Sequence, residues 1–184
     1  MAGQGLSLFR VNEMFMTHTN SDRLIRFARE YIRSPATVGS LVPSSSILAE
    51  KITAAALRYG AEDALVIEAG SGSGAITATL AASLLPTQRL IACEYNAGFA
   101  ATLRQRLPDV AIRNCLVQDL PQWQEEGAKI IVSSLPFRSL PKRNAREIVA
   151  CFRRALRRNP GSVLVQFSYG LRNPIPELAA ERCI

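Results

Sequence analysis

The sequence predicts an α/β fold with a doubly wound, mostly parallel sheet. Five short apolar segments alternate with segments of helical character. The first runs into three alternating glycines, Gly70, Gly72 and Gly74, and then directly into a helix. Parallel strands joined by right-handed helical crossovers place helices on both faces of the sheet. A chain of 184 residues, 48% of them hydrophobic, is expected to build one substantial core.

The first 45 residues are expected to form an extension ahead of the main domain, residues 46–184. Residues 1–19 show no clear period and are expected to be a loose arm. A helix is predicted over residues 21–33, with apolar side chains on one side and four arginines (Arg23, Arg26, Arg29 and Arg33) on the other. Such a helix can lie against an anionic membrane, or it can pack its apolar face on the domain, and both interpretations stay open.

The next segment, residues 36–46, is rich in proline, glycine and serine. It is expected to be a linker whose serines cap a helix over residues 46–59, and it is either an ordinary connection or a lid over a bound cofactor. Further helices are predicted at residues 74–84, 97–107 and 143–158. Strands are predicted at residues 64–68, 89–94, 110–114, 129–134 and 162–168.

Polar residues follow the strands at the edge where open parallel sheets bind ligands. Glu68 and the glycines end the first strand, and Glu94, 24 residues after Gly70, ends the second, where a carboxylate can accept both hydroxyls of a ribose. Asp119 and Leu120 offer a carboxylate and an N–H suited to an adenine edge. Gly70, Gly72 and Ala75 also satisfy the dinucleotide pattern, so a nicotinamide or flavin site remains open from these residues.

Charge and composition narrow the choice of partners. The formal charge is +7 and the isoelectric point is near 9.7, which implies an acidic partner such as nucleic acid or an anionic membrane. Between Arg138 and Arg158 stand eight arginines or lysines and one acid. The four cysteines are far apart and there is one histidine, so neither a metal site nor a disulfide framework is expected. A reduced cytoplasmic setting is expected, and no segment is long and apolar enough to predict a membrane span.

Four motifs at successive strand ends carry a family resemblance: V-I-E-A-G-S-G-S-G, A-C-E-Y-N, V-Q-D-L and V-S-S-L-P-F. They resemble motifs of the class I S-adenosylmethionine-dependent methyltransferases. Residues 27–184, including Y-I-R-S-P-A-T-V-G-S-L-V-P-S-S-S and V-Q-F-S-Y-G, resemble more narrowly the soluble bacterial phospholipid N-methyltransferases. Those enzymes methylate phosphatidylethanolamine stepwise toward phosphatidylcholine.

The resemblance implies a bound S-adenosylmethionine that is converted to S-adenosylhomocysteine. The residues expected to bind it are Glu68, Gly70, Ser71, Gly72, Gly74, Glu94, Tyr95, Asp119, Leu120 and Ser133. The residues expected at the reacting amine are Tyr31, Ser133, Phe137 and Tyr169. The aromatic ones can flank an alkylammonium by cation–π contact, and core packing is the alternative for Phe137.

The implied substrates are phosphatidylethanolamine and its methylated derivatives at the inner membrane surface, where the protein is expected to be peripheral. One alternative is an RNA adenine-N6 methyltransferase, although Ser133 or Ser134 stands where those enzymes have Asn or Asp, and Phe137 replaces Tyr. Another is a shortened, non-catalytic protein that binds cofactor or lipid, because the last two strands of the class are expected to be missing after residue 170. The strand at 162–168 is then expected to be an exposed sheet edge and a possible site of oligomerisation.

Overall fold

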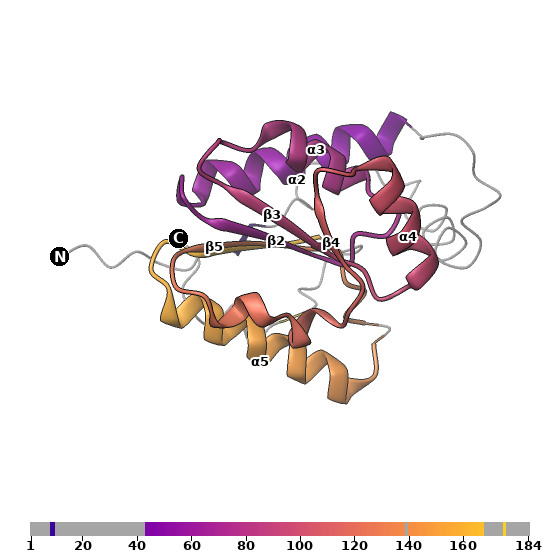
Figure 1. Cartoon of the computed structure of the whole chain (residues 1–184). Helices are drawn as coiled ribbons and strands as arrows, with labels where there is room; N and C mark the ends of the chain where they lie inside the picture. Colours follow the sequence, from indigo (N-terminus) through magenta and orange to yellow (C-terminus); the bar gives the residue numbers. More distant parts are fainter. Residues whose placement is uncertain (1–7, 10–42, 139, 168–174, 176–184) are drawn as a thin grey trace, which may run out of the picture.

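The computed structural model describes residues 8–9, 43–138, 140–167 and 175. They form a sheet of six parallel strands in the order β1-β6-β5-β2-β3-β4 (Figure 1). The bounds of the strands are β1 Leu8–Phe9, β2 Leu65–Ala69, β3 Arg89–Cys93, β4 Ala111–Arg113, β5 Lys129–Ser133 and β6 Val163–Gln166. The doubly wound α/β class is confirmed.

Helices cover both faces of the sheet. Helices α2 (Pro43–Tyr59), α3 (Ala75–Ser83) and α4 (Ala97–Arg106) lie on one face, and α5 (Lys142–Arg158) lies on the other (Figure 1). Two short 3₁₀ turns, η3 (Val117–Asp119) and η4 (Pro121–Gln124), accompany α5. The alternation of helix and strand puts consecutive crossovers on opposite sides of β2, which makes the edge beside β2 the place for a ligand.

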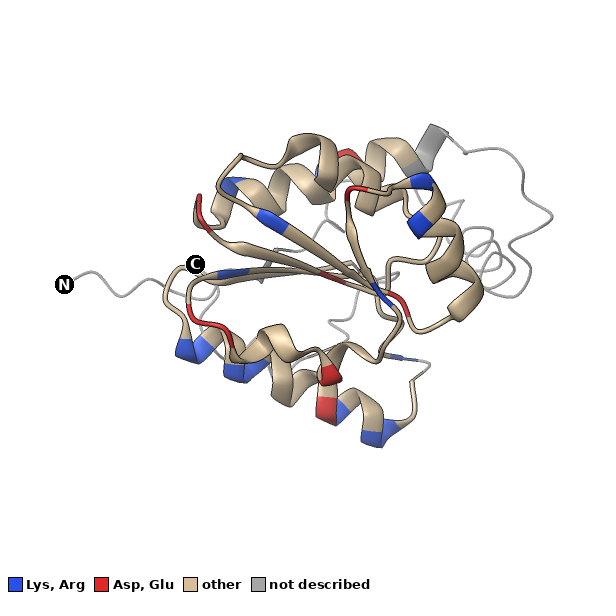
Figure 2. Ribbon diagram, viewed as in Figure 1, with Lys and Arg blue, Asp and Glu red and all other residues tan. Residues whose placement is uncertain are grey.

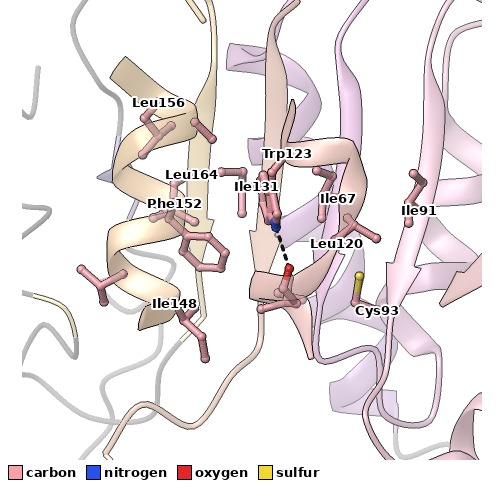
Figure 3. Packing of buried hydrophobic residues seen from close by; sticks show 14 of the residues in the cluster. Ile67, Ile91, Cys93, Leu120, Trp123, Ile131, Ile148, Phe152, Leu156 and Leu164 are labelled. Atoms are coloured by element: carbon pink, nitrogen blue, oxygen red, sulfur yellow. Dashed lines mark hydrogen bonds between the residues drawn. The ribbon is translucent and has the colours of Figure 1, made fainter. Parts of the chain in front are cut away.

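The core has a layer on each side of the sheet because successive strand residues point to opposite faces. On the α5 side, Ile148, Phe152 and Leu156 of the helix pack with the strand residues Ile67 and Ile131 (Figure 3). On the other side, apolar residues of α2 and α3 pack against the alternate residues of the same strands. Parallel strands buried on both faces read as continuous apolar runs, which is how they are recognised in the sequence.

The strand register aligns the residues that end four neighbouring strands. Ala69 of β2 lies opposite both Cys93 of β3 and Ser133 of β5, and Ser133 lies opposite Gln166 of β6. The carboxyl ends of four strands therefore meet along one edge of the sheet.

Two expectations are corrected: the residue at which the helix before β2 begins, and the exposed edge predicted for the strand at residues 162–168. Helix α2 begins at Pro43, three residues earlier than predicted, because the fixed φ of proline suits the first helical position. Leu8 and Phe9 pair with Leu164 and Val165, so the last strand is not an exposed edge over those residues. An extended segment of any sequence can pair with an unpaired strand edge, so two residues of an arm leave no pattern to detect.

The other predicted helices and strands in the described part have ends within one or two residues of those expected. The predicted helix at residues 21–33 and the question of strands after residue 170 lie outside the described residues. Among the helices that the structure describes, none combines the length and apolarity needed to cross a membrane.

Candidate functional site

The glycine loop between β2 and α3 is tied to the end of β3. Gly70, Gly72 and Gly74 all have positive φ, at 81°, 52° and 85°. The N–H groups of Gly70 and Ser71 both donate to the carbonyl oxygen of Cys93, at 2.9 and 3.1 Å. The loop therefore turns back over the ends of two strands and exposes backbone at the carboxyl edge of the sheet.

The space around the glycines differs from one to the next. A Cβ atom at Gly70 would lie 2.9 Å from Cδ2 of Leu135, so the segment after β5 comes close to the loop. A Cβ at Gly72 would meet no atom of the described residues within 4 Å, so these residues leave space beside Gly72. At Gly74 a Cβ would collide with Leu103 of α4, which is a packing requirement. A ligand can thus approach the backbone most closely at Gly72.

Glu94 joins the glycine loop to the next βα turn. Its Oε2 accepts from the N–H of Gly72 at 2.8 Å, and its Oε1 accepts from the N–H of Asn96 at 2.7 Å. A carboxylate has about four lone-pair sites, so both oxygens can still accept from a ligand. The structure confirms that Glu94 and the glycines are neighbours, as the motif spacing predicts.

Tyr95 and Asn114 complete this side of the site. Tyr95 is 72% exposed, next to Glu94. The side-chain amide of Asn114 donates to the carbonyl oxygens of Glu94 and Tyr95, both at 2.8 Å. Asn114, which sequence reasoning did not single out, therefore holds the end of β3 from the end of β4.

Glu68 is a buried acid beneath the loop, with no exposed surface. Its Oε2 accepts from the hydroxyl of Thr77 at 2.6 Å, and its Oε1 has no hydrogen-bond partner. Burial raises the pKa of Glu68 to about 7, although the nearby hydroxyl groups of Thr77 and Ser71 lower it and the charge of Glu94 raises it further. A cation bound near this carboxyl group would favour its ionised form.

Asp119 and Leu120 lie toward α5. Leu120 is buried in the core, and its N–H already donates to the carbonyl oxygen of Val117 at 3.3 Å. Asp119 is exposed and lines a groove of about 490 Å³ between the 3₁₀ turns and α5, with Cys151 and Arg154 opposite. Within the described residues no hydrogen bond joins Asp119 to the glycine loop, and an adenine-binding role for the two residues stays a prediction.

The segment after β5 combines buried polar groups with a core aromatic. Ser133 is fully buried, and its hydroxyl accepts from the N–H of Leu135 at 3.4 Å. Phe137 is 7% exposed and packs edge-on against Phe152, with ring centroids 6.4 Å apart. Core packing, the alternative considered for Phe137, describes its place in the structure. Tyr31 and Tyr169 lie outside the described residues.

Sequence reasoning missed Gln166, the last residue of β6. It is 6% exposed, lies opposite Ser133, and has one unpartnered side-chain oxygen. The signal was available, because a polar residue ends this apolar strand as at the other strand ends. Among the residues that the structure describes, no cluster of three or more histidine, cysteine or acidic side chains is placed to hold a metal.

Comparison with known proteins identifies relatives of this arrangement. Residues 66–159 match a family described as "Methyltransferase domain". The chain is similar to the ornithine lipid N-methyltransferase of Singulisphaera acidiphila, with 32% identity over 139 residues, which are 71% of this chain and 70% of that protein.

Solved structures share the fold. TrmN from Thermus thermophilus matches with a TM-score of 0.52 and 21% identity, over 81% of this chain and 43% of that one. An S-adenosylmethionine-dependent O-methyltransferase from Thermotoga maritima matches with a TM-score of 0.50 and 16% identity, over 83% of this chain and 53% of that one. The chain therefore spans about half the length of these two solved proteins, and at such identities the likeness concerns the fold alone.

Proposed function

Because this chain belongs to the class I S-adenosylmethionine-dependent methyltransferases, we propose that it methylates the amine of a membrane lipid, namely phosphatidylethanolamine and its methylated derivatives. The observation that carries the methyl-donor half of the proposal is the pair of Glu94 and Gly72, joined by a 2.8 Å hydrogen bond where the described residues leave space beside the glycine loop. The similarity to an ornithine lipid N-methyltransferase supports a lipid amine as the acceptor.

The residues at the loop fit the proposed cofactor. The open space at Gly72 admits a ligand against the backbone, and Glu94 offers acceptors for two ribose hydroxyls. The unpartnered oxygen of Glu68 fits a cationic group nearby, such as the ammonium of the cofactor. When bound, the sulfonium supplies a methyl group, which the lone pair of a neutral amine takes as the carbon–sulfur bond breaks and its electrons stay on sulfur.

The chain's contribution to this chemistry is mainly positioning. An in-line displacement needs the amine and the methyl carbon held in contact and in line, with water excluded. Leu135 packs against Gly70, and Phe137 is buried just beyond it, so apolar side chains flank the loop on the β5 side. No strongly basic side chain is required there, because a primary or secondary amine that arrives neutral needs only to lose a proton to water after transfer, and a tertiary amine has no proton to lose.

Phosphatidylethanolamine and ornithine lipid share a primary amine on a membrane lipid, so the same site chemistry suits both. The proposal also includes a peripheral position at the inner membrane, reached through the helix predicted at residues 21–33, which lies outside the described residues, and through the cations of α5. Figure 2 shows arginines and lysines along α5. An RNA adenine substrate is supported only by this positive charge, and β5 ends at Ser133 rather than in an Asn or Asp.

The test is an assay with methyl-labelled S-adenosylmethionine. The protein is incubated with vesicles that contain phosphatidylethanolamine, with vesicles that contain ornithine lipid, or with RNA. Label in the ethanolamine lipid supports the proposal. Label in ornithine lipid alone would mean that ornithine lipid, and not phosphatidylethanolamine, is the substrate. Label in RNA alone overturns the lipid substrate. Cofactor binding by calorimetry without transfer to any acceptor would instead indicate a non-catalytic binding protein.

A further inference from the structure

Gln166 lies at the carboxyl edge of the sheet, the same edge that carries the glycine loop. It ends β6, it is opposite Ser133 of β5, and Ser133 is in turn opposite Ala69, the last residue before the glycine loop. Gln166 is buried, with 6% of the residue exposed to solvent. A polar side chain so deeply buried needs hydrogen-bond partners.

The amide group of Gln166 has only half of its capacity satisfied. Its Nε2 donates to the carbonyl oxygens of Leu135 and Phe167, at 3.3 and 2.5 Å. Both partners are acceptors, so the amide cannot be turned over without placing oxygen against oxygen. The Oε1 atom is therefore fixed in place, and it is buried without a hydrogen-bond partner. A buried acceptor in this state is unfavourable unless a ligand supplies a donor.

The same amide group also holds the segment that follows β5 and approaches the glycine loop. Leu135, whose carbonyl oxygen accepts from Gln166, is the residue whose side chain approaches Gly70. The hydroxyl oxygen of Ser134, one residue before Leu135, is likewise buried without a partner. Two unpartnered polar atoms thus belong to residues at the carboxyl ends of β5 and β6, beside the glycine loop.

We propose that the free oxygen of Gln166 accepts a hydrogen bond from an N–H of the substrate amine and so orients its lone pair. This inference rests on the proposed function. A neutral amide oxygen suits primary and secondary amines, which keep an N–H while the lone pair attacks. A neutral tertiary amine has no N–H to donate. Gln166 is then a specificity residue for the early methyl transfers rather than the last.

The experiment compares Gln166→Met with the wild-type protein on three ethanolamine lipids that carry zero, one or two N-methyl groups. Methionine is nearly the same size and offers no comparable acceptor. We expect kcat/KM to fall about tenfold for the first two lipids, as for loss of one hydrogen bond to a ligand. For the dimethylated lipid we expect a change of less than about twofold, because its neutral amine has no N–H for Gln166 to accept. Affinity for the cofactor, measured by calorimetry, should stay unchanged.

Two further variants keep the test sharp. Gln88→Met is the matched control, because Gln88 is also buried but both ends of its amide are paired, with Leu85 and Ala61, at the opposite edge of the sheet. Gln166→Glu offers a protonated carboxyl that can donate to Leu135 and still accept, so it should restore the preference for amines with an N–H.

Four outcomes would count against the inference. Equal losses on all three lipids, or a loss of cofactor affinity, would show that Gln166 only supports the segment around Leu135. If Gln166→Met does not fold, Gln166→Glu decides the question. A Gln166→Glu protein without the preference for amines that carry an N–H would also count against the inference. A wild-type protein that methylates no amine lipid overturns the proposed function and this inference together. The assay of the wild-type protein alone separates that case from a failure of the inference about Gln166.

Discussion

Among single residues, Glu68 shows how burial can tune a carboxyl group at a ligand site. Its environment contains one donor to Oε2, no partner for Oε1 and the nearby charge of Glu94. The pKa of the group rises from 4.5 to about 7, first because of desolvation. Near neutral pH it therefore exchanges between neutral and ionised forms, and a bound cation can select the ionised one.

The first prediction concerns the pH dependence of stability. The folded protein holds the proton of Glu68 up to about pH 7, whereas the unfolded chain releases it near 4.5. The free energy of unfolding should therefore fall as pH rises between these values, by about 3 kcal/mol for this group. Glu68→Gln should remove this slope in urea titrations at pH 5 to 8, while the exposed Glu50→Gln should keep it. An unchanged slope in Glu68→Gln would assign the pH dependence to other groups.

The second prediction concerns Glu94. Glutamine at this position keeps one acceptor oxygen, so one of the two N–H contacts, to Gly72 or Asn96, is lost together with the charge. Affinity for S-adenosylmethionine should fall about 10- to 100-fold, the range for a hydrogen bond to a charged group. Calorimetry measures it, with Glu125→Gln as a control because Glu125 forms an exposed ion pair with Arg89. If Glu94→Gln binds S-adenosylmethionine as tightly as the wild-type protein, Glu94 only holds the loop and does not contact the cofactor.

Among the elements, α5 separates an apolar face from a basic one. Ile148, Phe152 and Leu156 are buried, whereas Arg146, Arg154 and other cations of the helix are exposed. The one acid of the helix, Glu147, is paired with Arg143 at 3.0 Å, and such exposed pairs add little to stability. The exposed side chains of Arg146 and Arg154 can therefore meet an anionic surface.

A third prediction follows for membrane binding. The double variant Arg146→Gln, Arg154→Gln should bind anionic vesicles about 30-fold more weakly, at about 1 kcal/mol for each cation near the surface. Sedimentation with vesicles measures binding, and the difference should shrink at high salt. The matched variant Arg58→Gln, Arg104→Gln removes two exposed cations from the opposite side of the sheet and should bind normally. Equal weakening by both variants would mean that only net charge matters.

For the whole molecule, the relevant feature is the edge of the sheet beside β6, which β1 covers. Residues Leu8 and Phe9 form β1 and pair with Leu164 and Val165, so backbone groups of β6 that would face solvent are hydrogen-bonded within the chain. An uncovered edge of apolar residues is a site for pairing between copies.

The fourth prediction is that deletion of residues 1–9 promotes self-association. It removes β1 and leaves the outer side of β6 unpaired. Light scattering coupled to gel filtration should show a larger species whose fraction rises with protein concentration. A deletion of residues 1–5, which spares β1, should behave as the full chain. Equal masses for all three proteins would show that β1 is not what keeps the edge from associating.

The fold was predictable from local patterns because each pattern reports a local physical preference. Apolar runs predict buried parallel strands, prolines and glycines end the helices, and the alternating glycines before α3 predict a turn with positive φ. The neighbourhood of Glu94 and the glycine loop was predictable for a similar reason. Both end adjacent parallel strands, and adjacent parallel strands end together.

What could not be predicted depends on residues far apart in the sequence. The pairing of β1 with β6, the edge-on contact of Phe137 with Phe152, and the place of Asp119 beside α5 follow from how elements pack. The unpartnered oxygens of Glu68 and Gln166 are of the same kind, since whether a buried atom finds a partner is decided by every element around it.

The sequence by itself therefore determined the α/β class, the order of the elements and the loop that identifies the family, because propensity, periodicity and turn chemistry act over a few neighbouring residues. Only the tertiary structure decided which polar groups at the sheet edge are already satisfied and which are free to meet a ligand. That distinction depends on strand register and burial. It separates Glu94, whose carboxylate holds the loop, from Gln166, whose side-chain oxygen has no hydrogen-bond partner.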